Sequence, residues 1–327
     1  MVLFLHMRNG KIDFLKGILI WSVVFGHCIN SLLQGTGYHN ELHVALRTFD
    51  MPMFMLISGF LLQGSLKRHN VWQLLANRTT GIVIPALLWI GVSIVICHPN
   101  NYYFLWAIYG STVTMVIIQK TLNNKLLQII SVIIITIGLH TTNVRLMNIP
   151  FLLPFFAVGY YLPKLETNNK IGLTTSLLFI AMLFFWKTDY TIWNIGANIF
   201  HEPSKMIPII SFRFIIGLIG IIAVTWLLSK IYDKTTNGPL TQTITGIGRE
   251  TLSIYLIQYI IVEVGIRELI KHITHNGIGN PFGQITQITG YLIAPLISFI
   301  IVFCIYHAIK YLKKYKFSKV LFGFKIF

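Results

Sequence analysis

The chain has 327 residues, of which 54% are hydrophobic and only 11% are charged. A soluble domain ordinarily carries about a quarter charged residues, so this composition excludes a soluble α/β enzyme and indicates a multi-pass membrane protein. The formal net charge of +16 would favour a nucleic-acid partner in a soluble protein. In a membrane protein it reports topology instead, and we expect no nucleic-acid partner.

Ten apolar segments follow one another along the chain, and each has 15 or more residues. Because roughly 20 apolar residues span a bilayer as a helix, we predict an all-α, polytopic membrane protein with about ten transmembrane helices. We expect a single membrane-embedded domain over residues 1–327. The predicted helices cover roughly 12–33, 44–65, 80–98, 102–119, 125–141, 148–163, 171–187, 208–230, 250–270 and 287–310.

The distribution of Lys and Arg predicts the orientation of these helices. When the N-terminus is placed in the cytoplasm, the inner segments carry 18 of these residues and the outer segments carry 7. Because Lys and Arg concentrate on the cytoplasmic side, we predict that both termini are cytoplasmic and that the protein lies in the plasma (inner) membrane. Residues 231–249 are then an inner loop, and 311–327 form a basic cytoplasmic tail that contacts anionic membrane lipid.

The three cysteines, Cys28, Cys97 and Cys304, lie in or beside apolar segments, and none has a Cys-x-x-Cys spacing. We interpret them as packing residues that form neither disulfides nor metal sites, and we expect no bound metal.

The segment 12–33 contains three ionisable side chains, Asp13, Lys16 and His27. Such groups are costly inside a membrane and indicate a functional site by default. Asp13 and Lys16 are three residues apart and can pair on one helix face. Lys16 and His27 point in the same direction about 16 Å apart along the axis, which predicts a polar stripe across the membrane. The alternatives are a Lys16 that extends to the inner interface and a His27 that is hydrogen-bonded in the core.

Asp50 lies near the outer end of the second segment, at a depth similar to that of His27 in the first. A carboxylate beside an imidazole orients the ring and raises its basicity. We therefore predict a pair between His27 and Asp50. The alternative is that Asp50 caps a helix broken at Pro52.

Arg78 opens the third segment on the predicted inner side. With Lys16, Lys67 and Arg68 it forms a basic cluster able to hold phosphate groups. The alternative is the ordinary positive charge of a cytoplasmic loop. On the outer side, arginines lie near aromatic, amide and acidic residues, a combination that suits a sugar but also an interfacial aromatic belt. The candidate sugar-binding residues are Arg47, Arg145, Arg213, Trp193 and Glu202.

Several stretches of the sequence resemble the acyltransferase-3 family of integral membrane acyltransferases, in particular its fucose 4-O-acetylase and polysaccharide intercellular adhesion protein C branch. The resemblance covers most of the chain and is most specific in residues 12–89. The stretches that carry it are "IDFLKGILIWSVVFGHCI", "DMPMFMLISGFLL", "NRTTGIVIPALLW", "NIPFLLPFFAVGYYLPK" and "GRETLSIYLIQYIIVEV". The family's arginine, ten residues and a histidine appear here as Lys16 and His27. Two further departures are Asp50 and Gln258, where many relatives carry histidine, and we include Gln258 among the substrate-binding candidates.

The resemblance implies that the protein is a membrane O-acyltransferase. It would take an acyl group, most often acetyl, from cytosolic acyl-coenzyme A and pass it to a hydroxyl of a cell-envelope polysaccharide or lipid-linked glycan. Lys16, with Asp13 beside it, and Arg78 would hold the coenzyme. His27, oriented by Asp50, would act as a general base or carry the acyl group.

Two other functions remain open from the sequence alone. A polysaccharide exporter is the first alternative, although exporters more often show internal repeats or paired broken helices, and neither is evident here. The second is a proton-conducting or structural membrane subunit that uses His27 as a relay.

Overall fold

The computed structural model describes residues 9–34, 40–140, 149–165, 167–187, 190, 203–275 and 280–323. The described part of the chain contains helices and no strand, which confirms the predicted all-α class. Three π-helical segments are labelled η. The elements are α1 (Gly10–Leu32), α2 (Glu41–Arg68), α3 (Val71–Arg78), η3 (Thr79–Val83), α4 (Ile84–Val95), α5 (Tyr103–Thr121), α6 (Lys125–His140), α7 (Ile149–Tyr161), α8 (Asn169–Leu183), α9 (Pro203–Thr235), α10 (Pro239–Arg249), α11 (Thr251–Gln258), η6 (Tyr259–Ile266), α12 (Arg267–Ile273), α13 (Pro281–Gln284), α14 (Thr286–Ile288), η8 (Thr289–Ile293), α15 (Ala294–Leu312) and α16 (Lys316–Leu321).

Within the described ranges, five helical stretches are long and apolar enough to cross a membrane. They are Gly10–Leu32, Glu41–Arg68, Val71–Val95, Pro203–Thr235 and Thr286–Leu312. Helices α6, α7 and α8 are apolar but shorter. The membrane character is thus supported, whereas the count of ten spans and the orientation of the termini stay predictions.

The outer surface of the helix bundle is unusually apolar. Leu88 and Ile94 on α4, Ile134 on α6, Leu177 on α8 and Leu296 on α15 are all at least 41% exposed. In water, continuous apolar faces of this kind would drive association or aggregation. We interpret them as surfaces that contact lipid.

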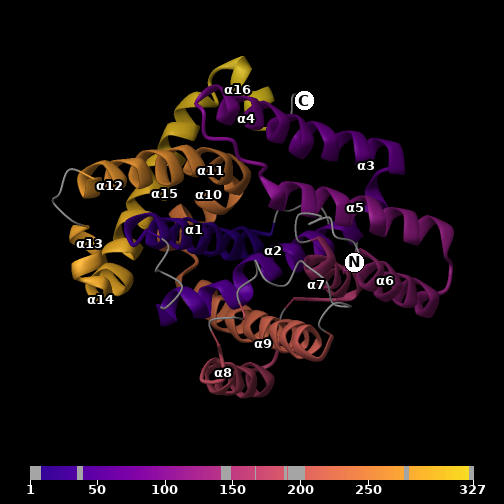
Figure 1. Ribbon diagram of the computed structural model, residues 1–327. Helices are drawn as coiled ribbons and strands as arrows, with labels where there is room; N and C mark the ends of the chain where they lie inside the picture. Colours follow the sequence, from indigo (N-terminus) through magenta and orange to yellow (C-terminus); the bar gives the residue numbers. More distant parts are fainter. Residues whose placement is uncertain are drawn as a thin grey trace.

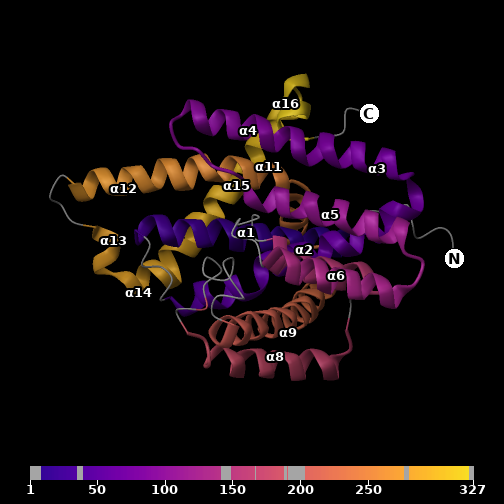
Figure 2. The same cartoon turned by 45° about the vertical axis from the view of Figure 1, so that its right-hand side comes forward.

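Helix α1 lies in the middle of the bundle, between α10, α11 and α15 on one side and α2 and α9 on the other (Figures 1 and 2). Most of its residues are buried, including the small residues Gly17 and Gly26. This central position explains why a helix with Asp13, Lys16 and His27 in its apolar part is stable in the fold, since protein rather than lipid surrounds them. Helix α8 lies at one edge against α9, and α3 and α4 lie at the opposite edge, as both views show.

The loop predicted over 231–249 is helical instead, because α9 continues to Thr235 and α10 occupies most of the remainder; its cytoplasmic location stays a prediction. Pro239 stands in the first turn of α10, where its missing N–H leaves no broken hydrogen bond. Glycines that are typical of loops serve here to pack two helices together. A Cβ on Gly17 would lie 2.2 Å from the Ile244 carbonyl oxygen, and one on Gly248 would lie 1.7 Å from that of Asp13. Only glycines allow α1 and α10 to approach this closely.

Helices α2 and α7 cross in the same way. A Cβ on Gly59 would lie 1.9 Å from the Phe156 carbonyl oxygen, and a Cβ on Gly159 would lie 1.9 Å from that of Leu56. Small residues at a helix crossing are the usual means of close packing within membranes. The crossing holds the part of α2 that carries Asp50 at a fixed depth beside α1.

The C-terminal tail packs back onto the bundle over its described part. Helix α16 lies beside α4 (Figure 2), where Trp89 Nε1 donates to the Leu321 carbonyl oxygen at 3.0 Å. Contact of the basic tail with anionic lipid stays a prediction. All three cysteines are free, and only Cys28 is buried. The packing interpretation therefore holds for Cys28 and is wrong for the exposed Cys97 and Cys304.

Candidate active site

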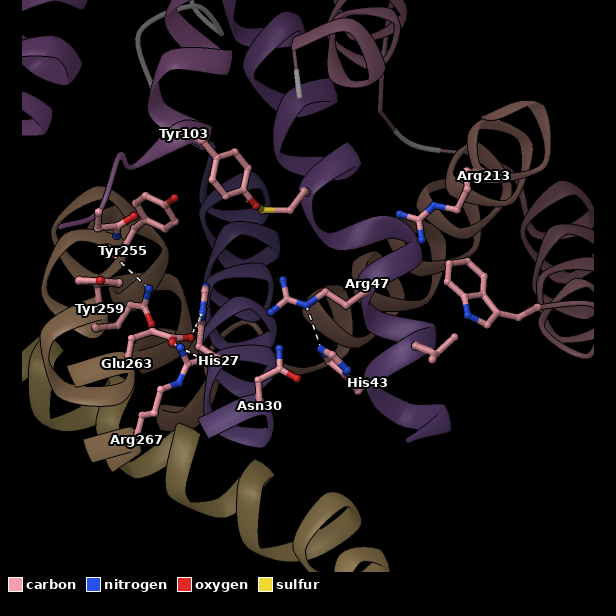
Figure 3. Close-up of a pocket in the computed structure, with 15 residues that line it drawn as sticks. His27, Asn30, His43, Arg47, Tyr103, Arg213, Tyr255, Tyr259, Glu263 and Arg267 are labelled. Carbon is pink, nitrogen blue, oxygen red and sulfur yellow. Dashed lines mark hydrogen bonds and ion pairs between the residues drawn. The ribbon is translucent and has the colours of Figure 1, made fainter. Parts of the chain in front are cut away.

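A cavity of about 330 Å³ lies among α1, α2, α9, α11, η6 and α12. Figure 3 shows its contents: His27, Glu263 and Arg267 gather on one side, Arg213 lies on the other, and Arg47 projects between them. We call it the outer cavity, because His27 lies towards the predicted outer end of α1. Its wall combines aromatic side chains with several charged ones. It therefore suits a polar ligand whose ring can pack against an aromatic side chain.

His27 is held by a carboxylate, but the carboxylate is Glu263. Nδ1 of His27 lies 2.7 Å from Glu263 Oε1, and Arg267 Nη2 lies 2.6 Å from Glu263 Oε2. An ionised carboxylate can only accept hydrogen bonds. The ion pair with Arg267 favours that form, so Nδ1 donates to Glu263, and in the neutral imidazole the lone pair lies on Nε2. About 32% of the His27 side chain is exposed and His27 lines the cavity, so a substrate in the cavity can reach the imidazole.

The predicted pair between His27 and Asp50 is wrong, because the two oxygens of Asp50 have other partners. Oδ2 accepts from Arg47 Nη1 at 2.9 Å, and Oδ1 accepts from the Met51 backbone N–H at 2.6 Å. Asp50 is fully buried. The alternative of a helix broken at Pro52 is also wrong, because α2 continues from Glu41 to Arg68. Asp50 therefore holds Arg47, which lies one turn earlier on α2.

Arg47 crosses from α2 to lie against α1. Its Nη2 donates to the Val23 carbonyl oxygen at 3.1 Å, and its Nε donates to His43 Nε2 at 3.2 Å. A Cβ on Gly26 would lie 1.7 Å from Nη2 of Arg47. The absence of a side chain at Gly26 thus creates the space in which the guanidinium lies, one residue before His27.

A second cavity of about 280 Å³, the inner cavity, lies further towards the predicted cytoplasmic side and is lined by Lys16 and Arg78. Lys16 Nζ lies 3.3 Å from Asp13 Oδ1, as the spacing predicts, and Arg249 Nε reaches Asp13 Oδ2 at 3.4 Å. Met51 and Tyr255 line both cavities. The two cavities therefore adjoin, and together they follow α1 from Lys16 to His27.

Comparison with known proteins assigns the chain to a family. Residues 9–307 match the family Acyl_transf_3, described as an acyltransferase domain. The chain belongs to this acyltransferase family. It is 28% identical over 224 residues to nodulation protein NolL of Sinorhizobium fredii, covering 57% of this chain and 60% of that protein. It is 27% identical over 201 residues to nodulation protein NolL of Mesorhizobium japonicum, covering 54% of each. The chain thus spans a little over half the length of these curated relatives. No solved structure matches.

The structure of this acyltransferase domain brings most of the predicted site residues together. His27, Arg47, Arg213 and Gln258 line the outer cavity, and Lys16 and Arg78 line the inner one. The remaining sugar-binding candidates, Arg145, Trp193 and Glu202, lie outside the described residues.

Sequence reasoning missed Glu263, whose carboxylate contacts His27, and Arg267, which pairs with Glu263. The signal was present, since Glu263 is a lone carboxylate in the apolar run "YIIVEVGI". It also lies in the π-helical segment η6, and such wide turns are frequent at functional sites. The pairing itself joins residues 236 positions apart, which no local pattern predicts.

Proposed function

We propose that this acyltransferase is a membrane O-acyltransferase that moves an acyl group, most often acetyl, from cytosolic acyl-coenzyme A to a hydroxyl of a cell-envelope polysaccharide or lipid-linked glycan. The observation that carries the proposal is the His27–Glu263 pair on the outer cavity, directly beside a second cavity that holds Lys16 and Arg78. Donor and acceptor would meet where the cavities adjoin.

The inner cavity suits the donor. Phosphate groups of the coenzyme require cationic partners, which Lys16 and Arg78 supply at its wall. The remaining lining is largely apolar, for example Phe54, Ile57 and Leu105, and this matches the extended, mostly uncharged pantetheine arm. The thioester would then reach past Met51 and Tyr255 into the outer cavity.

Acyl transfer requires a base for the acceptor hydroxyl. Nε2 of His27 takes the hydroxyl proton while the acceptor oxygen attacks the thioester carbonyl carbon. The C–S bond breaks, and the leaving thiolate recovers the proton from His27. Glu263 keeps the ring in the required tautomer and stabilises the transient imidazolium, and Arg267 keeps Glu263 ionised. If His27 carries the acyl group transiently, the same pairing orients it.

Arg47 is placed to stabilise the negative charge that develops on the carbonyl oxygen. It lines the cavity and lies against Gly26, directly before His27 in the chain. Donors fixed in advance at such a position contribute about two to three orders of magnitude to acyl transfer. Asp50 would serve this step indirectly by holding Arg47.

The acceptor would bind the remaining polar wall. Asn30 Oδ1 and Gln258 Oε1 are buried and have no hydrogen-bond partner among the described residues, and both side chains line the outer cavity. Buried polar atoms without partners are rare. Sugar hydroxyls would supply the missing donors.

The test is transfer of labelled acetyl from acetyl-coenzyme A by the purified chain in detergent, with a crude glycan extract as acceptor. Wild type should release coenzyme A and label the extract, and His27→Ala should do neither while it remains monodisperse. Undiminished turnover by His27→Ala would remove His27 from the reaction. No turnover by wild type with acetyl or other short acyl donors would favour the exporter alternative.

A further inference from the structure

Arg213 is the largest fully buried side chain among the described residues, with 1% of its surface exposed. It projects from α9 into the outer cavity on the side opposite His27 (Figure 3). Its guanidinium carbon lies 4.7 Å from the centre of a Trp186 ring and 5.7 Å from that of Phe151. Both distances lie within the range of cation–π attraction, so the two rings help to hold the guanidinium in place.

The edge of the guanidinium is unsatisfied. Nε and Nη2 of Arg213 are buried and have no hydrogen-bond partner among the described residues. These two nitrogens form the side of the guanidinium that binds both oxygens of a carboxylate or phosphate at once. A buried cation that lacks such a partner is strongly unfavourable, so the edge is arranged for a ligand.

Asp50 attracts Arg213 through space, but Arg213 forms no direct ion pair with a carboxylate of the described residues. Arg47 is paired with Asp50 at 2.9 Å, and Arg267 is paired with Glu263 at 2.6 Å. Both oxygens of Asp50 are already hydrogen-bonded. Among the described cationic and acidic groups at this cavity, Arg213 is therefore the positive charge in excess.

We propose that Arg213 binds an anionic group of the acceptor, so that the acceptor is an acidic glycan bearing a carboxylate or a phosphate. The identification of the ligand as the acceptor rests on the proposed function, but the anion site itself does not. One end of the acceptor is held by its charge at Arg213, and a hydroxyl at the other end is presented to His27. Trp186 and Phe151 hold the guanidinium in place beside the cavity.

The experiment measures thermal unfolding of the purified full chain in detergent with three probes: methyl glucuronide, glucose 1-phosphate and the neutral methyl glucoside. The variants are Arg213→Gln, Arg213→Lys and Lys205→Gln. The last removes one charge from an exposed position on the same helix. Wild type and Lys205→Gln should show a concentration-dependent rise in Tm with at least one anionic probe and none with methyl glucoside. The responding probe identifies a carboxylate or a phosphate as the group bound.

Arg213→Gln should bind that probe at least tenfold more weakly, and Arg213→Lys should retain part of the response, because it keeps the charge but loses the two-nitrogen edge. Without any probe, Arg213→Gln should have a Tm equal to or above that of wild type, since it removes an uncompensated buried charge. A purely structural arginine would lower that Tm and leave the probe response unchanged. That result, or a wild type that responds to neither anion, overturns the proposal.

Consumption of acetyl-coenzyme A, measured on the same samples, separates this proposal from the one it rests on. An anion response that depends on Arg213 without acetyl transfer would reject the acyltransferase reaction and keep the anion site. Acetyl transfer with no anion response would keep the acyltransferase reaction and reject the anion site.

Discussion

Replacing Gly26 with alanine tests whether the glycine exists to place Arg47. The added Cβ would lie 1.7 Å from Nη2, 2.3 Å from Cζ and 2.5 Å from Nε of Arg47. Ordinary contact begins near 3.4 Å, so the guanidinium must retreat by nearly 2 Å. The arginine side chain is flexible, and the clash alone is cheap. The cost arises because the retreat breaks hydrogen bonds to Val23, His43 and Asp50.

Removing one partner of a buried ion pair costs about 3–5 kcal/mol, and alanine recovers roughly 0.5–1 kcal/mol of helix propensity. We therefore expect Gly26→Ala to lower stability by about 2–4 kcal/mol. If Arg47 stabilises the carbonyl oxygen, acetyl transfer falls by about two to three orders of magnitude at saturating acetyl-coenzyme A. Thermal unfolding and labelled transfer measure the two effects separately.

Gly91→Ala is the matched control, because an added Cβ there meets nothing within 4 Å. It should leave the rate unchanged and raise stability slightly. If Gly26→Ala has the Tm and the rate of Gly91→Ala, the reasoning is refuted, and Arg47 is not held by the space at Gly26.

Three further changes have distinct expected results. Glu263→Gln should lower kcat by about two orders of magnitude or more with little change in KM for acetyl-coenzyme A, whereas the exposed Glu268→Gln should not; equal rates would show that Glu263 does not orient the imidazole. Lys16→Ala should raise KM for acetyl-coenzyme A by about tenfold while Lys16→Arg retains it, since a charged phosphate contact contributes about 1.5–3 kcal/mol; an unchanged KM would leave Lys16 as a side chain that only reaches the membrane interface. Gly159→Val should prevent recovery of monodisperse protein, because the Leu56 carbonyl oxygen lies 1.9 Å from the Cβ position; a normal yield and Tm would mean that the α2–α7 crossing can open.

Composition and local sequence pattern determined the fold class of this protein and the contacts within single helices. Long apolar runs with few charges favour helices in a membrane, and the structure has a helix in each predicted run. Within the described residues, five helical stretches are long and apolar enough to qualify as spans. The spacing of Asp13 and Lys16 likewise predicts their contact, because three residues along a helix always bring two side chains to one face. The polar stripe on α1 could be predicted for the same reason.

Only the tertiary structure decided which carboxylate serves His27. Asp50 and Glu263 are both acids within apolar segments of the sequence, and periodicity along one helix says nothing about the rotation of another. The close crossing of α2 and α7 at Gly59 and Gly159 and the π-helical turn η6 set those rotations. They direct Asp50 to Arg47 and bring Glu263 to His27, since the partner of a buried charge is chosen by packing in three dimensions.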